Sequence, residues 1–444
     1  MKTIVINLWE SLKTSFWFLP GLIVISSIII SYFTIAVDKS CNANTYQLPE
    51  ILFTGGAEGA RAVLATIAGS MITITGVTFS ITIVALTLAS SQFGPRLMRN
   101  FMKDRGNQVV LGIFNATFIY CLLILRSVDT TETYAFVPNI STSFAVVLAL
   151  INVGILIYFI HHISSSIQAD HIISSVYKEL MASIDRLFPE ELGYDVNQEK
   201  IDAVDQVQQK TCQKSCDLVA KQSGYLQAIN NEALMDKITT NDWLIRIHYR
   251  PGEFIVEGSP LVTLYYDYEF KDDDTEKILQ SFLIGDKRTP EQDIEFSIHQ
   301  LVEIAARALS PGINDPFTAI TCIDRLGSIM GRLCSKKFPS ARRCDDQGNL
   351  RIMTKPFTFV GITNGAFDQI RQYSQSNAAV TIRLLEIIKI IAPLARNQPQ
   401  REVLLKQAQM IERVSRQSLP DENDQKDMQE RYQDLLEALR PENE

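Results

Sequence analysis

Residues 62–95 read AVLATIAGSMITITGVTFSITIVALTLASSQFGP and contain no charged side chain. An uncharged helix of this length is typical of a membrane span, because roughly 20 apolar residues cross the hydrocarbon layer of a bilayer. At a rise of about 1.5 Å per residue, some 30 helical residues exceed the thickness of that layer, about 30 Å. We therefore expect the helix to tilt, to project into the cytoplasm or to break, and Gly94-Pro95 is the natural place for a break.

One face of this helix carries small and hydroxylated side chains every three or four residues, which is the spacing of a single helix face. We call it the α-stripe, and it comprises Ala62, Thr66, Gly69, Thr73, Gly76, Ser80, Ile83, Thr87 and Ser90. Small residues let helices approach closely, and hydroxyls bond across helices or meet water. The α-stripe therefore predicts that this helix faces either protein or a wet path, and both uses stay open.

Three other uncharged segments are long enough to cross a bilayer. With the first, they place four predicted transmembrane helices at about residues 16–37, 62–91, 107–125 and 141–160. The earliest of these is too long for the apolar core of a signal peptide, lacks a small-residue cleavage site and precedes further spans, so we expect an uncleaved anchor.

The charges of the connecting loops orient the spans. Residues 94–106 carry one acidic side chain, Asp104, against four basic ones, which are Arg96, Arg99, Lys103 and Arg105. The loops at residues 38–61 and 126–140 hold more acidic than basic side chains. Because cytoplasmic loops collect Lys and Arg, we expect residues 94–106 and both termini on the cytoplasmic side of a bacterial inner membrane.

The basic loop also suggests a site. With Gln92, one helical turn before Arg96, it forms a predicted inner-mouth cluster of Gln92, Arg96, Arg99, Lys103 and Arg105. Such a cluster can bind anionic lipid headgroups or gather anions at the inner mouth of a pore. The plainer interpretation is that its charges only set the topology.

The remaining residues predict a cytoplasmic α+β domain, so the fold class is an α-helical membrane protein with four transmembrane helices and a cytoplasmic α+β domain. A helix at residues 161–191 should continue the fourth span, strands are expected at 218–230, 243–250 and 350–359, and a helix at 366–373. The expected organisation is a transmembrane domain at 1–162, a helix and linker at 163–216, a β-rich module at 217–270, a mainly helical module at 271–360 and a helical region at 361–444.

The composition limits which partners, disulfides and metal sites we expect. A formal net charge of −8 argues against nucleic acid. Of the seven cysteines only Cys41 would face the outside, so no disulfide framework is expected. Cys212 and Cys216 lie one helical turn apart without a nearby histidine, so we expect no metal site and no cofactor.

Several motifs together resemble a widespread bacterial family of predicted membrane proteins that is described only as a domain of unknown function. They are GGAEGAR (55–61), MITITGVTFS (71–80), SSQFGPR (90–96), LGIF (111–114), SGYLQ (223–227) and RALSPGINDP (307–316). The resemblance implies an inner-membrane protein with a cytoplasmic domain, and it implies no reaction and no catalytic residue.

The last of these motifs has two interpretations. Arg307, Asn314 and Asp315 are the candidate residues of a ligand loop, which Gly312 and two prolines would hold in a fixed shape. Alternatively the motif is a turn between two helices, with Asp315 as the N-cap and Pro316 as the first residue of the second helix.

Two functions follow from these observations. The first is an oligomeric channel-like protein that passes ions or small solutes passively and is gated by its cytoplasmic domain, with membrane lipids and further copies of the chain as partners. The alternative is a non-conducting membrane-anchored sensor or scaffold whose cytoplasmic domain binds a small molecule or a protein. The sequence lacks phosphate-binding loops, dinucleotide fingerprints and the common hydrolase motifs, so we expect no enzyme.

Overall fold

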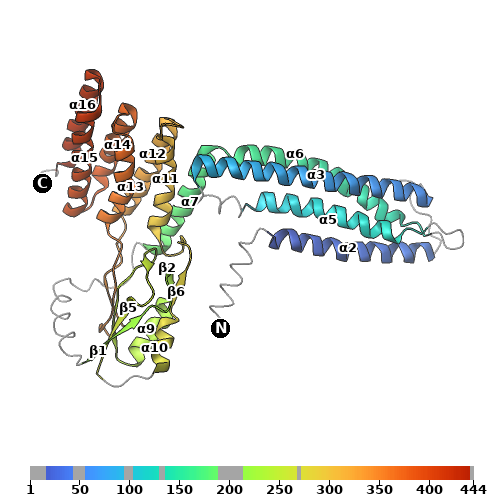
Figure 1. Ribbon diagram of the computed structural model, residues 1–444, viewed down its shortest axis with the longest axis horizontal. Coiled ribbons are helices and arrows are strands. Elements are labelled where there is room, and N and C mark those ends of the chain that lie inside the picture. The colour runs from blue at the N-terminus through green and yellow to red at the C-terminus, as the bar shows by residue number, and fades with distance from the viewer. Residues whose placement is uncertain are drawn as a thin grey trace. The chain divides into compact units, whose positions relative to one another are not determined.

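The computed structural model describes residues 17–43, 56–94, 104–129, 136–188, 214–267 and 272–440 (Figure 1). The chain divides into two compact units, residues 1–172 and residues 173–444. The first is helical and the second combines helices with two sheets, which confirms the predicted fold class.

The membrane unit contains four helices that are long and apolar enough to cross a membrane. They are α2 (Phe18–Ala43), α3 (Gly56–Phe93), α5 (Arg105–Ser127) and α6 (Asn139–Ser166). In α5 56% of the most apolar window is buried, against 17% in each of the others. Helix α5 is therefore the centre of this unit, and it packs against α2, α3 and α6.

Helix α3 runs unbroken for 38 residues, which corresponds to a length of about 57 Å. It ends at Phe93, and Gly94 has a φ of +108°, a conformation that glycine adopts without strain. The expected break at Gly94 is therefore confirmed as the end of the helix. Because no break occurs earlier, a helix of this length must tilt in a bilayer or extend beyond it.

The structure corrects the prediction of one continuous helix over residues 161–191. Helix α6 ends at Ser166, and α7 (Ala169–Leu187) begins after Ile167 and Gln168. The hydroxyls of Ser165 and Ser166 donate to the carbonyl oxygens of the residues four positions earlier. At the interruption the Gln168 backbone N–H donates to the Ser165 carbonyl oxygen, and the first turn of α7 begins with the bond from the Ile172 N–H to the Gln168 carbonyl oxygen.

Two sheets form the β part of the second unit. The five-stranded sheet has the order β1-β5-β3-β8-β7 and the three-stranded sheet the order β4-β2-β6. The strands are β1 (Lys214–Val219), β2 (Gly224–Ile229), β3 (Leu244–Ile247), β4 (Phe254–Ile255), β5 (Pro260–Tyr266), β6 (Phe282–Gly285), β7 (Arg342–Cys344) and β8 (Leu350–Met353). Three of them, β6, β7 and β8, come from outside residues 217–270.

The strand predicted at 218–230 is in fact two strands, β1 and β2, which join different sheets. Residues 221–223 turn the chain between them. A side chain at Gly224 would lie 2.9 Å from the carbonyl oxygen of Gly285, so glycine permits the close approach of β2 and β6. The polar run Lys221-Gln222-Ser223 before Gly224 was the available signal for this turn.

The other helices of this unit pack on one another in a stack (Figure 1). They are α11 (Ile294–Ala308), α12 (Pro316–Cys334), α13 (Phe359–Tyr373), α14 (Ala378–Ile391), α15 (Gln398–Ser418) and α16 (Glu422–Leu439), and the shorter α9 (Asn231–Thr240) and α10 (Asp272–Leu279) accompany the strands. The prediction of strand up to residue 359 was wrong, because Thr358 caps a helix that begins at Phe359.

Candidate functional site

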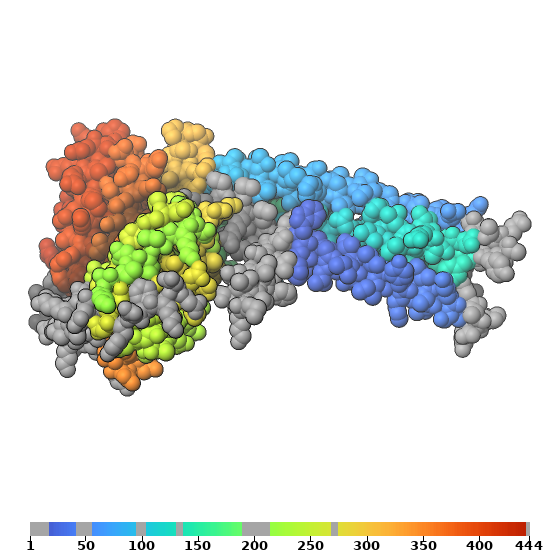
Figure 2. Space-filling model, turned by 60° about the horizontal axis from the view of Figure 1, so that its bottom comes forward, coloured from blue at the N-terminus to red at the C-terminus, as the bar shows by residue number. Residues whose placement is uncertain are grey.

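The α-stripe lies on the exposed face of α3. Thr66, Gly69, Thr73, Gly76, Ser80 and Thr87 are all exposed. The buried residues of α3 lie on the opposite side of the helix, and they include Ala60, Leu64, Ala68, Met71, Thr78, Ala85 and Ala89. Figure 2 shows α3 as a light-blue band along the outside of the membrane unit. Among the described residues, the packing of α3 within the membrane unit therefore uses mainly the face opposite the α-stripe.

The hydroxyls of the α-stripe donate to the backbone of their own helix. Thr73 donates to the carbonyl oxygen of Gly69 at 2.9 Å, and Ser80 to that of Gly76 at 3.0 Å. Thr66 and Thr87 make the same bond, at 2.7 and 2.9 Å. Each hydroxyl oxygen keeps an acceptor position that faces outward. The face can therefore contact a neighbouring helix without leaving a donor unpaired, or it can accept hydrogen bonds from water.

The two glycines of the α-stripe leave shallow places on this face. A Cβ atom added at Gly69 or Gly76 would meet no atom within 4 Å. Intrachain packing therefore does not require a glycine at either position. A glycine inside a helix lowers its stability relative to alanine. A close contact with another helix, or a path for solute outside the single chain, would explain why glycine stands at both positions.

Polar side chains also lie inside the membrane unit, and sequence analysis missed them. Asn152 of α6 is 2% exposed, and its amide donates to the Thr117 hydroxyl of α5 at 2.9 Å. The same amide lies 3.3 Å from the Met71 sulfur of α3. Asn152 thus connects three helices. A lone asparagine within the uncharged run 141–160 was the available signal, since polar groups in spans usually pair across helices.

The inner-mouth cluster is described only in part. Gln92 is exposed at the end of α3, and Arg105 is exposed in the first turn of α5. Arg96, Arg99 and Lys103 lie outside the described residues.

A contact beside this cluster was not predicted. Asp104 is the N-cap of α5 and accepts from the Gly106 backbone N–H at 2.9 Å. Its other carboxylate oxygen lies 2.6 Å from Nε2 of His162, near the end of α6. The pair joins α5 to α6.

The loop of residues 310–316 has the geometry of a helix-connecting turn. Asp315 caps α12, accepting from the Thr318 backbone N–H at 3.1 Å and from the Thr318 hydroxyl at 2.6 Å. Asn314 is exposed and has a φ of +50°. Arg307 lies 3.4 Å from Glu303, one turn earlier in α11. Cap chemistry therefore accounts for Asp315, and ligand binding by Arg307 and Asn314 stays a prediction.

Comparison with known proteins places most of the chain in one family. Residues 13–389 match the family model described as "Predicted membrane protein (DUF2254)". An uncharacterized protein of Mycobacterium bovis is 31% identical over 385 residues, which cover 85% of this chain and 72% of the relative. An uncharacterized protein of Mycobacterium tuberculosis shows the same identity and coverage. No solved structure matches the chain.

Proposed function

The chain belongs to the predicted membrane protein family DUF2254, and from this premise we propose that it assembles as a homo-oligomer in the bacterial inner membrane and passively conducts ions or small solutes along α3. One observation carries the proposal: a helix of 38 residues presents an uncharged stripe of Thr, Ser and Gly on a face that the described residues leave exposed. A face of this kind is poorly suited to lipid tails and well suited to a neighbouring helix or to water.

Copies of the chain are the partners that best suit this face. Three helices, α2, α3 and α6, pack on α5, which is the most buried of the four spans, so α5 itself occupies the centre of one copy. Symmetric association would turn the same face of α3 from each copy toward a common axis. Other exposed side chains of α3 are large and apolar, including Ile72, Val77, Phe79, Val84 and Leu88, and these suit contact with lipid.

The proposed orientation puts both termini and the α+β unit in the cytoplasm. Single cysteines introduced at Asp129 and at Gln92, in a background where Cys41 is serine, test it with a membrane-impermeant maleimide on intact cells. We expect labelling at Asp129→Cys, because it follows α5 at the predicted outer side, and none at Gln92→Cys until the membrane is opened. Labelling of Gln92→Cys in intact cells would show that the proposed orientation is wrong.

Substitutions at Gly76 separate conduction from simple helix packing. If the α-stripe lines a water-filled path, Gly76→Leu should reduce ion flux in proteoliposomes to the level of protein-free vesicles, because hydrophobic constrictions close pores. The oligomer should survive, as judged by its mass in mild detergent. Gly76→Ser should keep the oligomer and change the flux only moderately.

The control is Val77→Phe, which adds bulk at a side chain that is 55% exposed and about 100° round the helix. This variant should conduct like the original protein. If Gly76→Leu dissociates the oligomer first, the α-stripe serves packing, and the protein is better described as a membrane-anchored scaffold. A protein that passes none of the tested cations, anions or small solutes would contradict the proposal.

A further inference from the structure

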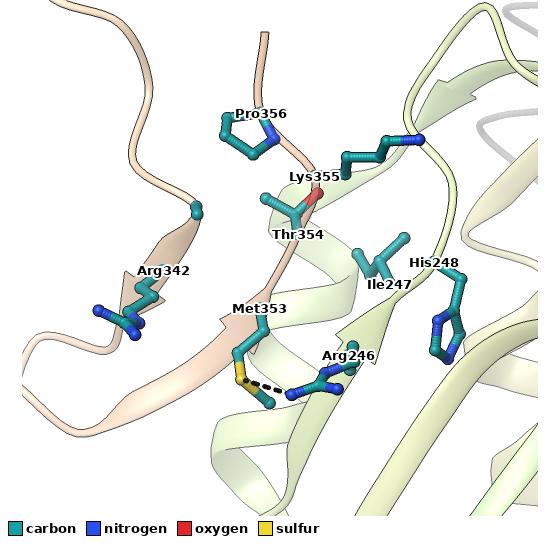
Figure 3. A pocket seen from close by; sticks show the side chains of 9 residues that line it. Arg246, Ile247, His248, Arg342, Met353, Thr354, Lys355 and Pro356 are labelled. Carbon is teal, nitrogen blue, oxygen red and sulfur yellow. Dashed lines mark hydrogen bonds between the residues drawn. The ribbon is translucent and has the colours of Figure 1, made fainter. Parts of the chain in front are cut away.

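A shallow basic pocket lies on the five-stranded sheet, and it shares no residue with the candidate sites considered above. It has a volume of about 420 Å³ and is lined by Arg246, Ile247, His248, Ala341, Arg342, Met353, Thr354, Lys355 and Pro356 (Figure 3). Three of these nine residues are cationic, one is a histidine and none is acidic. The lining is therefore basic although the whole chain has a formal net charge of −8.

The strand register explains how the basic side chains come together. Arg246 of β3 pairs with Met353 of β8, and Met353 pairs with Arg342 of β7. Partners in register point to the same face of a sheet, so both arginines flank Met353 on one face. Two strand spacings separate their backbones by about 10 Å. Figure 3 shows the Arg246 guanidinium beside the Met353 sulfur, at 4.0 Å.

Arg246 is an uncompensated cation. It is exposed at the pocket, and no carboxylate pairs with it within the part of the chain that the structure describes. Lys355, by contrast, is held by Glu253 at 2.5 Å, so its charge is largely balanced. The next residue along β7, Arg343, is half-buried, and burial lowers the pKa of its guanidinium. An arginine remains charged even so, which adds positive potential at this edge of the sheet.

Hydrogen bonds orient the imidazole of His248 at the side of the pocket. The Thr263 hydroxyl donates to Asp217 at 2.6 Å, so its proton is already used. Thr263 must therefore accept from Nε2 of His248, 2.8 Å away. The pocket thus combines an oriented imidazole, two guanidiniums and an apolar wall that includes Ile247, Met353 and Pro356.

We propose that this pocket binds a soluble phosphorylated small molecule, with Arg246 and Arg342 on the phosphate groups and the apolar wall against its organic part. A guanidinium can donate two parallel hydrogen bonds to two oxygens of one phosphate group. The lining contains no acidic side chain, which favours binding of an anion over binding of a cation. Arginine side chains are long enough for two guanidiniums to reach one phosphorylated group from backbones about 10 Å apart. The proposal does not depend on conduction by the membrane unit.

Calorimetric titration of the full-length protein in nanodiscs with ADP and with pyrophosphate tests this site. We expect saturable binding of ADP that weakens as salt rises. Arg246→Gln should lower the affinity at least tenfold, because a charge-assisted pair is lost, and Arg246→Lys should restore part of it. Arg416→Gln, which removes the same charge from a side chain that is 76% exposed and lies outside the pocket, should leave the affinity unchanged.

Three results would overturn the proposal. The first is the absence of binding to either probe. The second is an equal loss of affinity in Arg246→Gln and Arg416→Gln, which would mean that the probes are attracted by the overall charge of the protein and not by this pocket. The third is Arg246-dependent binding of phosphatidylglycerol vesicles without binding of ADP or pyrophosphate, which would assign the basic side chains to lipid headgroups. Because Arg246 is exposed on the sheet, its variants should keep the melting temperature of the original protein, and Arg246→Lys tests the site should the glutamine variant not fold.

Discussion

Replacing Arg351 by methionine should destabilise the α+β unit by about 3–5 kcal/mol, because a buried carboxylate loses its cation. The Arg351 side chain is 9% exposed and lies 2.7 Å from Asp345, whose side chain is 5% exposed. It also contacts Asp242, at 2.5 Å, but that side chain is 82% exposed. Without Arg351, Asp345 keeps only its hydrogen bonds to residues 347 and 349.

The same variant should have a distinctive pH dependence. Burial tends to raise the pKa of Asp345, but hydrogen bonds from Arg351 and Asn349 outweigh it, and the pKa is lowered. A carboxyl with a lowered pKa stabilises the fold at pH values above its unfolded pKa, about 3.9, and this contribution is lost as the pH falls through the folded value. In Arg351→Met the carboxyl can protonate instead, so the stability difference from the original protein should shrink at acidic pH.

Urea unfolding at pH 7 and near pH 4, followed through the circular dichroism of the full-length protein in detergent, measures both effects. Asp242→Asn is the matched control. It removes the exposed partner of Arg351, and exposed pairs contribute only about 0–1 kcal/mol. Asparagine also tolerates the positive φ of 55° at this position. A loss below about 1 kcal/mol in Arg351→Met would contradict the importance of the buried pair.

Replacing Asp38 by alanine should destabilise the membrane unit by about 2–4 kcal/mol, because the first turn of α6 loses its acceptor. Asp38 belongs to α2 and is 2% exposed. Its two carboxylate oxygens accept from the backbone N–H groups of Ile140 and Ser141, both at 2.9 Å, and from the Ser141 hydroxyl at 2.5 Å. A negative charge at a helix N-terminus is also favourable.

Thermal unfolding of the purified protein in detergent measures this loss. Asp38→Asn retains one acceptor oxygen and should lie between the original protein and Asp38→Ala. Glu58→Gln is the control, since Glu58 is an exposed acid in the first turn of α3 and should tolerate the change. If Asp38→Ala is as stable as Glu58→Gln, α6 does not depend on the contact with α2.

The sequence by itself determined the membrane spans and the family. Long uncharged runs admit few structures other than transmembrane helices, because every backbone polar group must be paired within lipid. The N-cap of α12 and the end of α3 at Gly94 were likewise predicted, since capping chemistry involves neighbours in the chain. Local interactions of this kind are visible in the order of the residues alone.

Only the tertiary structure decided which side chains meet across elements. Asp38 and Ser141 are 103 residues apart, and Arg246 and Arg342 share a face through the register of three strands. The two faces of α3 are both rich in small residues, so periodicity did not tell which one its own chain covers. Packing on α5 and α6 buries the face that includes Leu64 and Met71, where alanines at positions 60, 68, 85 and 89 let the neighbouring helices approach closely, and the α-stripe stays exposed.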